Sequence, residues 1–520
     1  MNIISYSDSV FTVLPPIIAI VLAITTRRVL LSLGVGILVG SLLLTQFSII
    51  DSSYYLVNTV SALFWADGTI NTWNLYILFF LLLLGMITAL ISVSGSANAF
   101  ANWARRRVKS KRDAKVLTVF LGIIIFIDDY FNSLVVGTVA RPITDRYYIS
   151  RAKLAYLLDS TAAPVCVISP VSSWGAYIIA LIGGILTTHG IANKSYLGTF
   201  IEMIPMNFYA LFSLLLLMFV CWFGLDVGPM RKHENNAKRG ELYDESKGTP
   251  PGSVDELPEE NNGSVAGLFL PIAVLVIATI SFMFWTGASA LASKPMDFTF
   301  IKAFEMTDVG LSLVLGALCG LAISLVQVFK QQVRASYIQL ALLQGAKSML
   351  PAIYILLFAW TIAAVIGQLE TGKYMANLAT GSIPFALLPA VMFALAGITA
   401  FSTGTSWGTF GIMLPIAADM AMGSHIGMML PMLSAVLSGA VCGDHCSPIS
   451  DTTILSSTGA SCHHIDHVTT QLPYALIAAG ISLVGYLVLG FTESVSYGLM
   501  TCSAIFVFIV CLMKIKTTQP

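Results

Sequence analysis

The chain has 520 residues, of which 56% are hydrophobic and only 10% are charged, and its mean hydropathy is +0.83. Because ordinary soluble domains carry about 25% charged residues, this composition excludes that class and predicts a polytopic membrane protein. Lysine and arginine together number 27, as do aspartate and glutamate, so the net charge gives no electrostatic case for a nucleic-acid partner.

The first apolar segments have the length of membrane spans, since a helix needs about 20 apolar residues to cross the hydrocarbon core. They fall near residues 10–26, 29–50 and 73–94, and a strongly basic stretch at 105–115 follows the third. Because basic loops stay in the cytoplasm, we expect the N-terminus outside and this stretch inside.

Residues 116–140 form an apolar segment with the polar sequence IDDYFNS at its middle. Basic residues flank it on both sides, with Arg141 and Arg146 directly after it. This pattern favours a re-entrant hairpin that enters and leaves from the cytoplasm, with Asp128 and Asp129 near its tip. A single tilted span with a charged exit is the alternative.

A broken crossing is predicted for residues 154–188, which are too long for one simple span and contain Pro164 and Pro170. Irregular backbone at that depth survives only where protein or water lines it. Residues 200–224 then return inward. The hydrophilic segment 226–264 has the composition of a solvated, flexible linker.

The second half repeats this plan in the opposite orientation. The expected elements are spans near 265–287, 309–328 and 348–368, a hairpin between Pro384 and Pro415, a broken crossing at 427–460, and closing spans near 472–491 and 496–513. Lys514 and Lys516 place the C-terminus inside. We therefore predict an all-α polytopic membrane protein with two inverted-topology repeats, re-entrant helical hairpins and broken transmembrane helices. The domains are a first repeat at 1–225, a cytoplasmic linker at 226–264, and an inverted repeat with an extra C-terminal helix at 265–520.

Polar side chains gather at the interruptions of these segments, although each central charge costs roughly 2.5–3.5 kcal/mol on insertion scales. Sodium is a hard cation that prefers oxygen ligands, and helix breaks free backbone carbonyls to help supply them. The predicted cation- and proton-binding residues are Asp128, Asp129, Asn132, Ser133, Asp159, Thr161, Ser402, Thr405, Ser406, Asp444, Ser450, Asp451 and Thr452. Among them Asp128, Asp129 and Asp451 are the preferred Na⁺ ligands. The competing interpretation is that some of these side chains cap half-helices or form hydrogen bonds in the core.

Two further groups of residues have alternative interpretations. Ser173, Trp174, Thr403 and Trp407 could shape a pocket for an organic substrate, although packing of the tryptophans against the broken helices is the commoner role. Cys442, Asp444, His445 and Cys446, with the histidines at 463–467, contain the residue types of a zinc site but not its usual spacing. We expect the histidines to form a polar inner loop.

Four motifs, IDDYFNSLVVGT, DSTAAPVCVISPVSSWG, FSTGTSWGTFGIMLP and CGDHCSPISDTTILSSTGA, together resemble the NhaC family of sodium:proton antiporters. The similarity extends over residues 70–490. It implies sodium:proton antiport, a fold with inverted repeats and re-entrant hairpins, and cation binding at Asp128, Asp129, Asp159, Asp444 and Asp451. The family also includes exchangers of organic solutes, such as a malate:lactate antiporter, and members linked to amino acids.

We therefore expect a secondary transporter of the inner (cytoplasmic) membrane, not an enzyme, that exchanges Na⁺ for H⁺ without a Walker-type ATP site. No cofactor is expected beyond Na⁺ and H⁺ as transported or coupling ions. The alternative is a Na⁺- or H⁺-coupled carrier of a small organic acid or amino acid. A homodimer in the lipid bilayer is an open possibility for the assembly.

Overall fold

The computed structural model describes most of the chain, and Asp128 lies outside the described part. The described residues are 6, 8–26, 28–66, 68–96, 99, 103, 108–126, 129–170, 172–191, 196–252, 263–292, 299–371, 374, 383–424 and 426–518.

The described elements are helices apart from one two-stranded antiparallel pair, in which Trp65 pairs with Ile70. Those of the first half are η1 (Val10–Val13), α1 (Leu14–Thr26), α2 (Val29–Leu44), α3 (Ile49–Ala62), β1 (Trp65–Ala66), β2 (Thr69–Ile70), α4 (Thr72–Val93), α6 (Lys111–Ile124), α7 (Asp129–Arg146), α8 (Arg151–Cys166), α9 (Ser173–Thr188), α10 (Tyr196–Met203), η2 (Ile204–Met206) and α11 (Phe208–Phe223). The connecting segment holds α12 (Pro229–Ala237) and η3 (Glu245–Lys247). The second half contains α13 (Val265–Ala292), α14 (Phe300–Glu305), α15 (Val309–Lys330), α16 (Ala335–Gln368), η4 (Phe385–Leu387), α18 (Leu388–Thr403), α19 (Ser406–Ser424), η5 (Ile426–Met428), α20 (Met429–Cys446), α21 (Asp451–Gly459), α22 (His464–Thr492) and α23 (Val495–Thr518).

Seven helices of the described chain are long and apolar enough to span a membrane, or up to nine when each bent pair counts as one span. This confirms the prediction of an all-α polytopic membrane protein. The stretch between the predicted spans at 29–50 and 73–94 is not a plain loop, because α3 follows α2 there at a bend of 119°. Gln46 and Phe47 have φ values of 54° and 62°, so the left-handed backbone ends α2 and turns the chain into α3.

The first predicted hairpin consists of α6 and α7, which meet near residue 125. The Lys111 ammonium donates to the Tyr148 carbonyl at 2.7 Å, so the start of α6 lies beside the end of α7. Because α6 has 14 residues and rises about 1.5 Å per residue, it is shorter than the hydrocarbon core of about 30 Å. The predicted hairpin is therefore present and the single tilted span is not, while its entry and exit on the cytoplasmic side stay a prediction.

The second hairpin consists of α18 and α19, which meet at Gly404. Gly404 has a φ of 71°, a left-handed conformation that glycine adopts without a steric penalty, and it caps the C-terminus of α18. Close helix packing then fixes this hairpin against α20, because Gly439 and Gly443 present no side chains to the α18 backbone.

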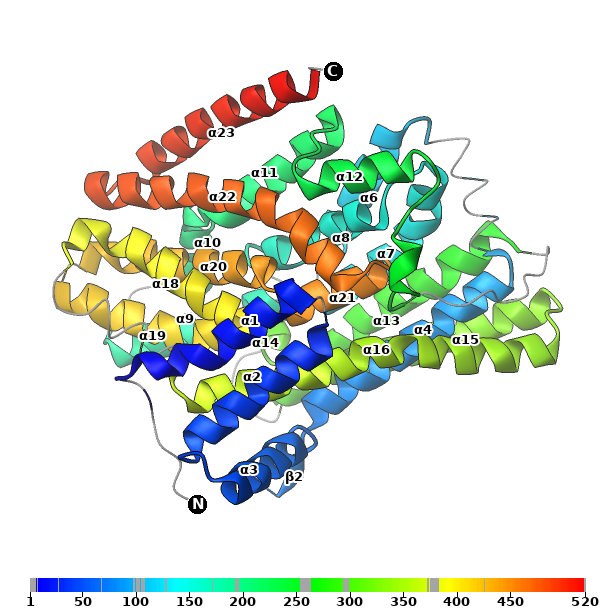
Figure 1. Cartoon of the computed structure of the whole chain (residues 1–520), viewed down its shortest axis with the longest axis horizontal. Coiled ribbons are helices and arrows are strands. Elements are labelled where there is room, and N and C mark those ends of the chain that lie inside the picture. Colours follow the sequence, from blue (N-terminus) through cyan, green and yellow to red (C-terminus); the bar gives the residue numbers. More distant parts are fainter. Residues whose placement is uncertain are drawn as a thin grey trace.

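Each hairpin is followed by a broken helix. The break between α8 and α9 includes Pro170, and the break between α20 and α21 includes Pro448. Pro164 lies inside α8, two residues before its end, so it does not itself start the interruption. Figure 1 shows α7, α8, α20 and α21 in the middle of the molecule, between α22 on one side and α16 on the other. The two hairpin tips and the two helix breaks therefore lie near the centre of the protein.

The described part of the hydrophilic connector, residues 226–252, differs from the expected solvated linker because it packs on both halves. Glu234 of α12 is buried and accepts hydrogen bonds from the Ser150 amide at 2.9 Å and the Ser150 hydroxyl at 2.8 Å, and it pairs with Lys111 at 2.8 Å. Lys247 pairs with Asp466 of α22 at 2.6 Å. Composition did not reveal these contacts, since each is a single charged residue meeting a distant partner.

Replacing Glu234 with alanine is expected to lower the melting temperature of the purified protein. The change leaves the N-cap of α8 without its acceptor and Lys111 without its ion-pair partner. We expect a loss of about 1–3 kcal/mol, most of it from the buried hydrogen bonds, since the ion pair is partly solvated. Thermal unfolding in detergent measures the effect. Glu241→Ala is the matched control, since the Glu241 side chain is exposed. Equal melting temperatures for the two variants would show that α12 does not anchor the connector.

Candidate functional site

The centre of the molecule holds three buried carboxylates around the break between α20 and α21. Asp444 lies in the last turn of α20, Asp451 is the first residue of α21, and Asp159 lies on α8. The three side chains are at most 6% exposed. The break itself is held open locally, because the Ser447 hydroxyl donates to the Phe401 carbonyl at 2.7 Å and the Ser450 hydroxyl caps α21 by accepting from the Thr453 amide at 3.2 Å.

Asp444 connects α20 to the tip of the second hairpin. Its Oδ2 accepts from the Ser406 amide at 3.2 Å and from the Ser406 hydroxyl at 2.7 Å, and the Ser450 hydroxyl also hydrogen-bonds this carboxyl group. Its Oδ1 is buried and has no hydrogen-bond partner among the described residues. A buried oxygen of this kind is costly unless a cation or a proton joins it.

Asp159 is bound by residues of the second half that the sequence analysis did not single out for this role. Its Oδ2 accepts from the Thr453 hydroxyl at 3.2 Å, from His467 Nε2 at 3.1 Å and from Gln471 Nε2 at 2.6 Å. The expected polar inner loop at 463–467 is wrong, because α22 begins at His464 and buries His467. The spacing of His467 and Gln471 by four residues places both on one helical face and could have signalled this contact.

Asp451 lies at the boundary between the carboxylates and a cavity. Its Oδ2 accepts a hydrogen bond from the Tyr130 hydroxyl at the tip of the first hairpin, and its Oδ1 accepts from the Thr452 amide at 2.8 Å. Asp444, Asp451 and Asp159 also lie close enough to interact electrostatically with one another. Repulsion among buried carboxylates disfavours the state in which all are ionised without a cation.

Asp129, at the tip of the first hairpin, is separated from the cavity by Trp174. Asp129 is buried and accepts from the Trp174 indole at 2.9 Å. Trp174 is itself buried, with its ring centroid 5.7 Å from that of Trp407. The structure therefore brings Asp129 to the same region as Asp451 without placing it on the cavity wall. Tyr130, its neighbour in the chain, makes the direct contact that the sequence analysis missed.

Several of the predicted site residues form hydrogen bonds within a helix or between helices. The Asn132 amide donates to the Gly122 and Ile125 carbonyls at 2.6 and 2.7 Å, and the Ser133 and Ser456 hydroxyls bond at 2.9 Å. The hydroxyls of Thr161 and Thr403 donate to carbonyls of their own helices, and the Thr452 hydroxyl bonds Ser450 at 2.9 Å. Ser402 is buried near the end of α18, and Ser173 begins α9 with its side chain outside the described part.

A histidine lies behind this cluster. His445 Nδ1 bonds the Tyr209 hydroxyl at 2.7 Å, and its Nε2 bonds the Ser160 hydroxyl at 3.1 Å. Within the described ranges, no three His, Cys, Asp or Glu side chains are grouped to hold a metal ion through those residues alone. A sodium site here would therefore draw on carbonyls and hydroxyls as well as carboxylates.

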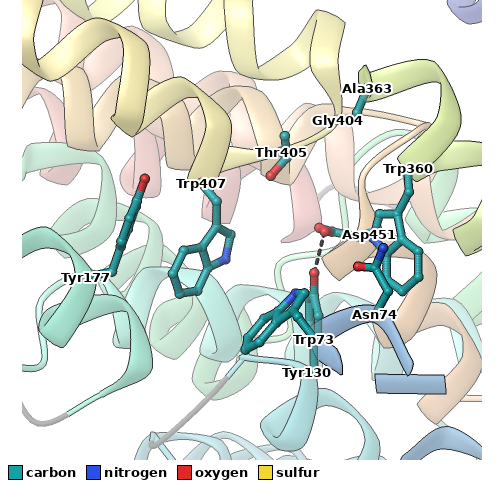
Figure 2. Close-up of a pocket in the computed structure, with 10 residues that line it drawn as sticks. All are labelled: Trp73, Asn74, Tyr130, Tyr177, Trp360, Ala363, Gly404, Thr405, Trp407 and Asp451. Carbon is teal, nitrogen blue, oxygen red and sulfur yellow. Dashed lines mark hydrogen bonds between the residues drawn. The ribbon is translucent and has the colours of Figure 1, made fainter. Parts of the chain in front are cut away.

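A cavity of about 390 Å³ opens beside Asp451 (Figure 2). Its described lining consists of Trp73, Asn74, Tyr130, Tyr177, Trp360, Ala363, Gly404, Thr405, Trp407 and Asp451. Figure 2 shows the hydrogen-bonded pair Tyr130 and Asp451 with Trp73 and Trp407 on one side and Trp360 on the other. Thr405 and Trp407, both predicted from the sequence, lie on this wall together with aromatic residues that were not predicted.

Known proteins resemble this chain over different lengths. An uncharacterized protein of Haemophilus influenzae is 52% identical over 517 residues, which cover 99% of this chain and 97% of that protein. The malate-2H⁺/Na⁺-lactate antiporter of Bacillus subtilis is 32% identical over 159 residues, covering 30% of this chain and 33% of that protein. The arginine/ornithine antiporter of Halobacterium salinarum is 36% identical over 158 residues, covering 28% of this chain and 29% of that protein.

The latter two alignments span about a third of each relative. A family model described as the Na⁺/H⁺ antiporter family matches residues 165–491, which include α20, α21 and most of α22 with their carboxylate-bearing segments. This confirms the resemblance recognised from the four motifs. The chain belongs to the Na⁺/H⁺ antiporter family.

Proposed function

We propose that the protein exchanges Na⁺ for H⁺ across the cytoplasmic membrane, with Asp444, Asp451 and Asp159 as the carboxylates that alternately hold the two cations. Family membership supports the coarser statement that the chain is a membrane transporter. The observation that carries the finer proposal is the gathering of these three buried carboxylates at one helix break.

The partners of the carboxylates support exchange rather than a purely structural role. The described partners of Asp159 are a threonine, a histidine and a glutamine, and those of Asp444 and Asp451 are hydroxyls and backbone amides. None of these is a lysine or an arginine that would neutralise the charge permanently. A mobile cation or a proton can therefore supply the compensating charge. A carboxylate that holds the proton no longer attracts the cation, and a bound cation disfavours protonation.

The ends of the half-helices add to this attraction for cations. α6, α8, α18 and α20 each end at one of the four interruptions, and the C-terminal end of a helix carries partial negative charge. Broken helices that expose carbonyls to a coupling cation are a recurring feature of secondary transporters. Their arrangement here supports a Na⁺ site that combines Asp444 and Asp451 with Ser406, Ser450 and backbone oxygens.

The order of elements supports the proposed repeats and orientation. A hairpin and a broken helix occur as α6–α7 with α8–α9, and again as α18–α19 with α20–α21. The mouth of the first hairpin carries Lys111 and packs on the connector, whereas α19 of the second ends beyond Asp419, which pairs with His189 at the end of α9. With basic residues retained in the cytoplasm, the connector end is inside, and both repeats run in opposite directions through the bilayer.

Reconstitution into liposomes tests this proposal. An inward sodium gradient is expected to alkalinise the lumen as protons leave in exchange for Na⁺, and reversal of the gradient is expected to reverse the pH change. A potassium gradient of equal size is the control. A lumenal pH that does not respond to sodium in either direction would show that Na⁺/H⁺ exchange is the wrong function.

The second candidate is a carrier that couples Na⁺ or H⁺ to a small organic solute. The cavity of about 390 Å³ favours it, because pockets for small molecules begin at about 300 Å³, whereas a bare ion needs far less room. Two partial relatives, a malate/lactate antiporter and an arginine/ornithine antiporter, are consistent with such cargo. Uptake of labelled solutes into the same proteoliposomes separates this candidate from exchange of ions alone.

A further inference from the structure

The lining of the cavity beside Asp451 carries information about the charge of its occupant. Trp407 is the centre of an aromatic cluster, with ring centroids 4.9 Å from Tyr177, 5.7 Å from Trp174 and 6.3 Å from Trp73. These contacts fix the orientation of the Trp407 ring. Trp360 supplies a further indole on the opposite side of Asp451 (Figure 2).

Aromatic rings around a carboxylate match a cation. The face of an indole carries negative electrostatic potential and attracts ammonium and guanidinium groups, most strongly when water is excluded. The described lining contains no lysine, arginine or histidine, and its single charged residue is Asp451. A carboxylate solute would meet repulsion from Asp451 without a compensating base, and Asp451 already occupies the positive N-terminal end of α21.

Membrane anchoring does not account for all of these rings. Tryptophans at the edges of a bilayer commonly face the lipid headgroups, and the partly exposed Trp73 fits that role. Trp407, in contrast, stands at the tip of a re-entrant hairpin, one residue after the Ser406 that binds Asp444. Trp407 therefore connects the aromatic wall of the cavity, formed by Trp73, Tyr177, Trp360 and Trp407, to the carboxylate cluster.

We infer that this cavity is a binding site for a small organic cation, a primary amine or a guanidinium compound, held by the face of Trp407 and the carboxylate of Asp451. The inference names a substrate class for the proposed transport site, and it rests on that proposal in treating Asp451 as a cation-binding residue. Na⁺ and the organic cation then compete, because both are neutralised by the same carboxylate.

Calorimetric titration of the purified full-length protein in detergent tests the inference. The probes are agmatine chloride and tetramethylammonium chloride, and potassium chloride and potassium malate are the controls. We expect agmatine to bind, NaCl to weaken that binding, and the potassium salts not to bind in the cavity. Trp407→Leu is expected to weaken agmatine binding about tenfold, with Trp407→Phe intermediate because it retains a ring with a weaker electrostatic attraction.

Trp285→Leu is the matched control, since Trp285 lies on α13 with 58% of its surface exposed. It is expected to bind agmatine as the parent protein does. Melting temperatures without ligand identify a variant that fails to fold. If Trp407→Leu fails to fold, agmatine binding is compared between Trp407→Phe and the parent protein.

The inference is overturned if neither organic cation binds the parent protein. It is also overturned if Trp407→Leu and Trp407→Phe bind agmatine as tightly as the parent protein does. Binding of malate that weakens in these variants would overturn it as well. Sodium-driven pH changes in proteoliposomes are scored separately. Exchange without agmatine binding removes only this inference, whereas agmatine binding without exchange removes only the proposed Na⁺/H⁺ function.

Discussion

Asp451→Asn is expected to reduce sodium-driven proton flux to the level of protein-free liposomes. Asparagine occupies nearly the same volume and can still accept the Tyr130 hydrogen bond, so the break between α20 and α21 is preserved. It carries no negative charge and takes up no proton in the working pH range, so it can neither balance Na⁺ nor exchange it for H⁺. Lumenal pH after a sodium jump measures the loss.

Asp419→Asn is the matched control, because Asp419 has the same chemistry on the surface, where its side chain is 72% exposed and pairs with His189. Flux through this variant is expected to equal that of the parent protein. Parental flux in Asp451→Asn would remove Asp451 from the exchange mechanism.

Gly443→Ala is expected to destabilise the protein and to abolish transport through the site at the same time. A β-carbon at position 443 would lie 2.0 Å from the Gly397 carbonyl oxygen and 2.7 Å from the Phe401 amide nitrogen, both in the backbone of α18. The two helices must separate, at a cost of about 1–3 kcal/mol or more for overpacking of this kind. Separation also moves Ser406 of the hairpin away from Asp444, which lies next to the substituted residue.

Gly480→Ala provides the comparison, since a β-carbon at position 480 of α22 meets no atom within 4 Å beyond the neighbouring backbone of its own helix. It is expected to leave the melting temperature unchanged or slightly raised, because alanine favours the helix. If the Gly443→Ala and Gly480→Ala variants have equal melting temperatures and Gly443→Ala transports normally, the close approach of α18 and α20 does not position the site.

The spans and interruptions could be predicted because a membrane imposes strong local rules. Apolar length fixed the long helices, basic flanks on both sides of 116–140 indicated the α6–α7 hairpin, and paired polar breaks indicated the broken helices. The amphipathic α3 and the packed connector were not predicted, because their stability depends on contacts such as Glu234 with Ser150 that join distant positions. Composition alone carries no record of such contacts.

The carboxylates of the site were predicted for a similar reason, since a charge inside a span is unexpected without a role. Their partners were not. Tyr130, His467 and Gln471 reach Asp451 and Asp159 only after four elements from both halves have assembled. The aromatic lining of the cavity could not be predicted either, because the sequences around Trp73 and Trp360 have the pattern of ordinary apolar spans.

Proton release on sodium binding tests the central claim most directly. In a weakly buffered detergent solution of the purified protein, addition of NaCl is expected to acidify the medium to a saturating level, because Na⁺ displaces protons held by the carboxylates at the α20–α21 break. Potassium chloride and the Asp451→Asn variant are expected to give no such release. Saturable sodium binding to the parent protein without any release of protons would contradict the account.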